Sequence, residues 1–167
     1  MAGAAATNSA GQLNGIADSL AGFPMSNFVS SADTSFGTHD WLVTRAILRL
    51  HEMGAPPHPI FSRGVGRFEV RWIGNDSWSE GTGTPSQPAA NGLAYKDLSA
   101  ILSPSQDETL GFFTNIGMDG PLSFNLALTP SFVLDVRSGT EVGLYFTAAS
   151  SQIGFTFDSR TYVVPDD

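Results

Sequence analysis

The last third of the chain alternates apolar and polar side chains, and this pattern constrains the fold more than any other feature of the sequence. In "LSFNLAL", leucine or phenylalanine takes every second position from Leu122 to Leu128, with serine, asparagine and alanine between. The segments "EVGLYFTA" (141–148) and "QIGFTF" (152–157) repeat the pattern. A period of two is that of a β-strand with one face on a core. The three segments therefore predict strands, and the short gap between the last two predicts a hairpin.

Two further segments show the same period. Residues 45–51, "RAILRLH", and residues 64–73, "GVGRFEVRWI", alternate between an inward and an outward set. The inward sets are Ala46, Leu48 and Leu50 in the first segment and Phe68, Val70 and Trp72 in the second. The outward sets are Arg45, Ile47, Arg49 and His51 in the first and Glu69, Arg71 and Ile73 in the second. Both segments predict strands. A helix is the alternative for the first, because the "GAPPHP" that follows it ends strands and helices alike.

The remaining segments carry weaker or mixed signals. Residues 13–36 lack a clean period and predict one or two short strands, while residues 74–95 are rich in Gly, Ser, Thr, Pro and Asn and predict a long loop. Residues 95–104, "YKDLSAILSP", predict one or two helical turns. Residues 129–139 predict a short helix, since a threonine cap and a proline begin it and a glycine ends it. Together, these predicted strands and helices indicate an all-β fold, an antiparallel β-sandwich or jelly roll with one or two short helices.

Composition narrows the environment and the partners. The 167 residues suit a single domain, predicted over residues 13–167, after a flexible segment at residues 1–12. Eight Lys and Arg against 16 Asp and Glu give a net charge of −8, which argues against a nucleic-acid partner. Cysteine is absent, Lys96 is the only lysine, and no apolar run reaches the roughly 18–20 residues that span a bilayer. We therefore expect no disulfide, no cysteine-ligated zinc, no membrane insertion, and a secreted or cell-surface location.

Two short motifs, in this order, resemble those of a known family. The segment "WSEGT" matches Trp-x-Glu-x-Thr, and "FDSR" matches a later Phe-x-Ser-Arg. The matching residues are Trp78, Glu80 and Thr82 in the first motif and Ser159 and Arg160 in the second. Over residues 41–162 the chain is similar to the DNRLRE-type modules, which are jelly-roll β-sandwiches of secreted and cell-surface bacterial and archaeal proteins. Variants occur in exported PEP-CTERM-type proteins of planctomycete-like bacteria.

The resemblance implies a structural role for these motif residues. It also implies carbohydrate binding as a further function, because some relatives are polysaccharide-binding modules attached to carbohydrate-active enzymes. Thr161 departs from the pattern, since the family usually has glutamate after the Ser-Arg pair.

Exposed aromatic rings are the usual platform for a bound sugar, because a pyranose stacks its apolar face on them. Trp78 lies in the polar loop, Tyr145 falls on the outward phase of its strand, and Tyr95 follows the loop. These three side chains are the candidate carbohydrate-binding residues. Trp72 is instead expected in the core, because it alternates in phase with the apolar positions of its strand. The alternative for Trp78 is a structural plug at the edge of the sandwich.

Three oxygen-bearing side chains of the same loop are candidate calcium ligands, namely Asn75, Asp76 and Glu80. Calcium takes roughly six to eight oxygen ligands, and this stretch supplies only part of such a shell. The alternative is an Asx-turn at Asn75–Asp76, with Glu80 accepting hydrogen bonds or paired to Arg160. No other cofactor is expected.

Motifs for catalysis are missing from the sequence. No serine lies in Gly-x-Ser-x-Gly, no His–Asp pairing is evident, and His39, His51 and His58 match no metal-ligand spacing. A pair of glycosidase carboxylates is the remaining enzymatic alternative. We therefore expect a non-catalytic extracellular module, a structural or adhesive element of an exported cell-surface or matrix protein that pairs with other copies or cell-surface proteins through its sheet edges. The alternative function is a carbohydrate-binding module that recognises polysaccharide through exposed aromatic residues.

Overall fold

The structure is a computed structural model, and it describes residues 2–3, 18–52, 65–79, 82, 91, 93, 95–117, 120–150 and 153–155. The described strands are β1 Ala2–Gly3, β2 Ser19–Pro24, β3 Ala46–Glu52, β4 Gly66–Ile73, β5 Glu108–Asn115, β6 Gly120–Leu126, β7 Glu141–Ala148 and β8 Gly154–Phe155. The helices are α1 Ser26–Phe36, the 3-10 helix η1 Tyr95–Ala100 and α2 Pro130–Ser138.

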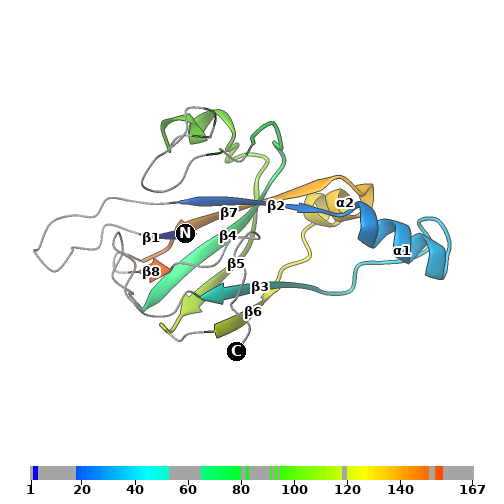
Figure 1. Ribbon diagram of the computed structural model, residues 1–167, viewed down its shortest axis with the longest axis horizontal. Coiled ribbons are helices and arrows are strands. Elements are labelled where there is room, and N and C mark those ends of the chain that lie inside the picture. Colours follow the sequence, from blue (N-terminus) through cyan, green and yellow to red (C-terminus); the bar gives the residue numbers. More distant parts are fainter. Residues whose placement is uncertain are drawn as a thin grey trace, which may run out of the picture.

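Two antiparallel sheets pack against each other in the arrangement of Figure 1. The larger sheet has the order β2-β7-β4-β5, and the smaller one pairs β3 with β6. One core cluster joins them, with Phe68, Leu144 and Phe146 from the larger sheet and Leu48 and Phe124 from the smaller. The predicted all-β sandwich with short helices is confirmed.

The inner strands of the larger sheet are covered on both faces at one end. Trp72 of β4 lies in the main core as predicted, but Ile73, predicted to point outward, is fully buried as well. Ile73 belongs to a second cluster with Ile101 and Tyr145. The half-buried Leu98 of η1 packs against this second cluster. The expected single covered face of β4 is therefore wrong at this end, because η1 and the residues after it cover the other face.

The sandwich is closed along β5 and β6. The register between β4 and β5 shifts after Val70, which leaves Leu110 as the extra residue of a β-bulge. The Leu110 side chain is buried, and its carbonyl oxygen accepts a hydrogen bond of 2.8 Å from the N–H of Ala127, just after β6. The bulge thus ties the edge of the larger sheet to the smaller sheet.

Helix α2 begins and ends where the sequence predicts, between Thr129 and a left-handed Gly139 with φ of 78°. The Thr129 side chain makes no capping hydrogen bond. Glu108 of β5 takes this place, accepting the N–H of Ser131 at 3.3 Å and that of Phe132 at 3.1 Å. Burial raises the pKa of Glu108, but hydrogen bonds to its carboxylate outweigh burial and leave the pKa lowered. The first turn of α2 is therefore capped by the Glu108 carboxylate, a charged group supplied by β5.

Three predictions fail in detail. The hairpin of residues 141–148 with 152–157 is wrong, since β2 and β4 occupy both edges of β7 and β8 pairs with β1. Of residues 13–36 the structure describes 18–36, and there β2 is a strand, as predicted, but the helix α1 follows it. Leu128, predicted inward, is 39% exposed because β6 ends at Leu126.

The flexible segment at residues 1–12 and the domain bounds stay predictions. Ala2–Gly3 form strand β1, and the rest of the predicted flexible segment 1–12 lies outside the described residues. Among the described residues, no helix is long and apolar enough to cross a membrane.

Candidate functional site

Two of the three tryptophans are held in the interior. Trp72 is buried, and its indole N–H donates to Asp135 of α2 at 2.7 Å. Trp41 is buried too, and its indole N–H donates to Asp33 of α1 at 2.7 Å. The backbone N–H of His39 and the Trp41 indole together lower the pKa of Asp33. Trp72 therefore fixes α2 onto the sandwich, Trp41 fixes the segment after α1 to that helix, and neither ring offers a flat platform to a sugar.

Trp78 packs against the second cluster, on Ile73, Ile101 and Tyr145, and is half-buried. Its indole nitrogen is buried and has no hydrogen-bond partner among the residues that the structure describes. This placement favours the interpretation of Trp78 as a structural plug. A role in sugar binding stays a prediction.

Tyr145 requires a correction. The outward phase of β7 predicted an exposed ring, but Tyr145 is only 7% exposed, and its hydroxyl donates to Asp18 at 2.7 Å. The reason is that Ile101, just after η1, packs with Tyr145 and with Ile73 of the neighbouring strand and so covers the second face of β7. A sugar cannot stack on a ring in this position.

The structure describes only some of the other predicted site and motif residues. The side chain of Tyr95 and the whole of Glu80, Ser159 and Arg160 lie outside the described residues, so the predicted pairing of Glu80 with Arg160 stays a prediction. Thr82 is described, and its backbone N–H donates to the side-chain oxygen of Asn91 at 3.2 Å.

Asn75 forms the Asx-turn that the sequence offered as an alternative to calcium binding. Its side-chain oxygen accepts the backbone N–H of Ser77 at 3.0 Å. Beside it, burial raises the pKa of Asp76, and the charges of Asp135 and Glu141 raise it further. In the described part of the chain no group of three or more His, Cys, Asp or Glu could hold a metal ion. Calcium binding at Asn75, Asp76 and Glu80 stays a prediction.

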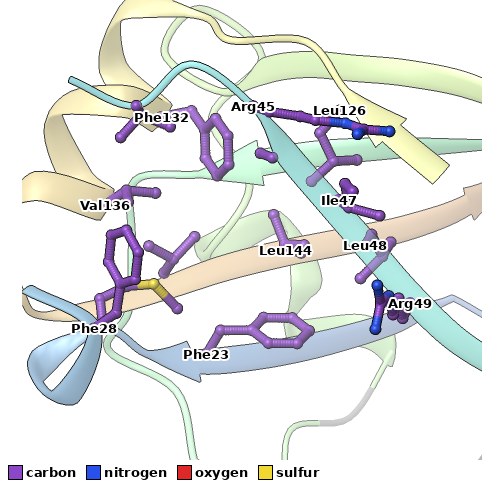
Figure 2. Close-up of a pocket in the computed structure, with 14 residues that line it drawn as sticks. Phe23, Phe28, Arg45, Ile47, Leu48, Arg49, Leu126, Phe132, Val136 and Leu144 are labelled. Atoms are coloured by element: carbon purple, nitrogen blue, oxygen red, sulfur yellow. The ribbon is translucent and has the colours of Figure 1, made fainter. Parts of the chain in front are cut away.

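An apolar cavity of about 300 Å³ lies between the two sheets on the side bounded by edge strands β2 and β3, which we call the β2/β3 side. Figure 2 shows Phe28, Phe132 and Val136 of the helices at one end and Leu126 and Leu48 at the other. The remaining lining residues are Phe23, Met25, Val43, Arg45, Ala46, Ile47, Arg49, Val142 and Leu144. The cavity exists because a two-stranded sheet cannot cover all four strands of the larger one.

Sequence reasoning missed this cavity, although one signal pointed toward it. The outward phase of residues 45–51 carries Arg45 and Arg49, two of only eight Lys and Arg in the chain. Phe28 could not be placed beside them from the sequence, because α1 was not predicted.

Comparison with known proteins finds no counterpart: no protein-family model, no curated protein and no solved structure matches the chain. The resemblance to the DNRLRE-type modules therefore stays a prediction from the two motifs.

Proposed function

We propose that the chain is a non-catalytic extracellular β-sandwich module, a structural or adhesive element of an exported cell-surface or matrix protein. In this proposal it associates with other copies or with other cell-surface proteins through its sheet edges. The observation that carries the proposal is the β2/β3 side, where β2 and β3 each have one edge without a partner strand among the described residues.

Unpaired edges are a physical reason for association. Each presents a row of backbone N–H and C=O groups that a further strand can satisfy. Exposed apolar side chains lie near both edges, including Phe28 just after β2 and Ile47 on β3. Association would cover these side chains together with the mouth of the cavity.

The described aromatic and acidic side chains support this function over the alternatives. Tyr145, a candidate ring for carbohydrate binding, is buried, and so is Trp72, so neither ring is exposed for a sugar to stack on. Among the described residues, the carboxyls with shifted pKa values are Asp33 in α1, Glu108 in β5 and Asp76 in the segment after β4. Asp33 and Glu108 are already engaged in hydrogen bonds that hold helices.

Light scattering over a range of protein concentrations tests the proposal, and the expected result is a molar mass that rises with concentration. The variant Gly22→Lys should suppress this rise, because a lysine on an edge strand opposes pairing with a further strand. The three atoms nearest to a Cβ at Gly22 all belong to the side chain of Glu141, whose flexible end can move aside and pair with the new lysine.

Ile116→Lys is the matched control. Ile116 is 53% exposed in the turn after β5, away from the β2/β3 side, so this lysine should leave association unchanged. A strictly monomeric wild-type chain at high concentration would contradict self-association. An equal effect of the two lysines would show that charge alone, and not the edge of β2, controls it.

A further inference from the structure

The edge of β3 opens directly onto the cavity of the β2/β3 side. Among the described residues β3 pairs only with β6, so its second edge has no partner strand. Five consecutive residues, 45–49, line the cavity, although inward and outward side chains alternate along a strand. The cavity therefore reaches the backbone of β3, where N–H and C=O groups of an unpaired edge require partners.

The outer face of β3 carries positive charge that the described residues do not neutralise. Arg45 and Arg49 are exposed and lie on the same face of the strand. Arg45 donates to the neutral side chain of Asn125 at 3.1 and 3.0 Å, and Arg49 pairs in register with Ser123. Among the described residues neither arginine has a carboxylate within ion-pair distance. The neighbouring strand β6 thus supplies no counter-charge, and the open edge is the side from which a carboxylate can approach.

We propose that the unpaired edge of β3 binds an extended segment of a partner protein in which apolar side chains alternate with carboxylates. The proposal rests on the proposed function and specifies the partner for one of its sheet edges. Added strands of this kind gain affinity from main-chain hydrogen bonds and specificity from alternate side chains.

The alternation of β3 dictates the pattern of the partner. A partner residue beside Leu48 directs its side chain to the same face as Leu48, into the cavity that Phe23 and Leu144 also line. The partner residues one and three positions away, beside Arg49 and Arg45, point to the outer face, where carboxylates form favourable cross-strand pairs.

The same charges argue against other occupants. If the β3 strands of two copies paired antiparallel about Ile47, Arg45 of one copy would lie opposite Arg49 of the other, and like charges in that position are destabilising. An apolar small molecule could fill the cavity, but it would leave both the arginines and the backbone edge without partners.

Fluorescence anisotropy tests this with the full chain and a labelled seven-residue peptide of alternating glutamate and valine. We expect saturable binding that weakens roughly 2- to 30-fold in the double variant Arg45→Gln, Arg49→Gln, because two cross-strand charge pairs are lost. Arg67→Gln is the matched control, since Arg67 is an exposed strand arginine on the other sheet and stacks on Phe112. This variant should bind the peptide as the wild type does.

Two altered peptides separate strand addition from general attraction. A peptide with lysine in place of glutamate should not bind, and a glutamate–valine peptide N-methylated at the residues whose N–H groups face β3 should lose binding because it cannot donate to β3. Equal affinity for either altered peptide would overturn the proposal. Equal loss of affinity in the Arg67→Gln control would overturn it as well.

Absence of saturable binding at about 1 mM peptide would also overturn it, and amide hydrogen exchange would then identify the occupant. Protection of all β3 amides in the monomer would identify a segment of the same chain. Protection that appears only with rising protein concentration would identify a second copy. Self-association without peptide binding would leave the proposed function standing and refute only the partner named for β3. Peptide binding by a chain that stays strictly monomeric would support the partner named for β3 and refute self-association.

Discussion

Asp76 is a carboxylate that the fold holds at a cost in stability. Burial raises its pKa, and the charges of Asp135 and Glu141 add repulsion. A carboxyl with a raised pKa binds its proton more tightly in the folded state than in the unfolded state. The ionised form therefore destabilises the fold near neutral pH, and this penalty disappears as the pH falls through the unfolded-state and folded-state pKa range.

Asp76→Asn should accordingly stabilise the protein. Because the side chain is exposed, the effect is at most about 1 kcal/mol, or about 2–4 °C in Tm, near pH 7, and it should vanish near pH 3. Thermal unfolding by circular dichroism measures it, with Asp97→Asn, an exposed carboxylate of η1, as control. A fall in Tm would contradict the prediction and would indicate that Asp76 holds a cation, which calcium titration of the wild type could then identify.

Single positions also reveal what alternation can and cannot predict. The inward phase placed Phe68, Val70 and Trp72 in the core correctly, because one face of any strand in a sandwich must be buried. The outward phase of Tyr145 led to a wrong prediction. Alternation predicts on which face of the sheet a side chain lies, but not whether another segment covers that face. In this chain η1 and its neighbours cover it, and nothing in the alternation of β7 refers to them.

At the scale of elements, α2 depends on a charge from β5. The Glu108 carboxylate is held in the ionised form by its hydrogen bonds to the first turn of α2. Because the folded-state pKa is lowered, this stabilisation is present above the ordinary value of 4.5 and is lost as the pH falls through the folded pKa.

Glu108→Ala should therefore cost about 0.5–2 kcal/mol near pH 7, the usual range for a lost helix cap, and much less near pH 3. Urea unfolding at the two pH values measures the difference. Thr114→Ala, an exposed position of the same strand, is the control and should change stability little at either pH. An equal loss from Glu108→Ala at both pH values would show that packing, not the ionised cap, is what Glu108 supplies.

Elements were predictable where they pack regularly and were missed where they do not. In β5 the bulge at Leu110 breaks the period of two, so no clean pattern marks the strand. In α1 no residue is fully buried, so no apolar face marks the helix. Only α1 borders the candidate site, because it contributes Phe28 to the cavity, whereas β5 closes the opposite side of the sandwich. The open β2/β3 side depends on how many strands each sheet has and in what order they lie. No local pattern in the sequence predicts either.

At the scale of the whole molecule, the two strand edges of the β2/β3 side differ in charge. β2, "SLAGFP", carries no ionisable side chain, whereas Arg49 lies on the outer face of β3 and Arg45 comes directly before the strand. Self-pairing is therefore unopposed by local charge at β2 and opposed at β3. Contact of β2 with β2 is isologous and closes as a dimer, so we expect discrete dimers and no open filament.

Net charge predicts how this dimer responds to salt. Two copies at −8 each repel one another, and the repulsion is screened as the Debye length falls from about 20 Å at about 20 mM salt to a few ångströms at about 500 mM. The dissociation constant should therefore fall roughly fivefold over this range, as sedimentation velocity can measure. Gly22→Lys should remain monomeric throughout, because it removes the contact itself and not the long-range repulsion. A dimer that weakens with salt would contradict pairing through the uncharged β2 edge and would place specific ion pairs at the interface.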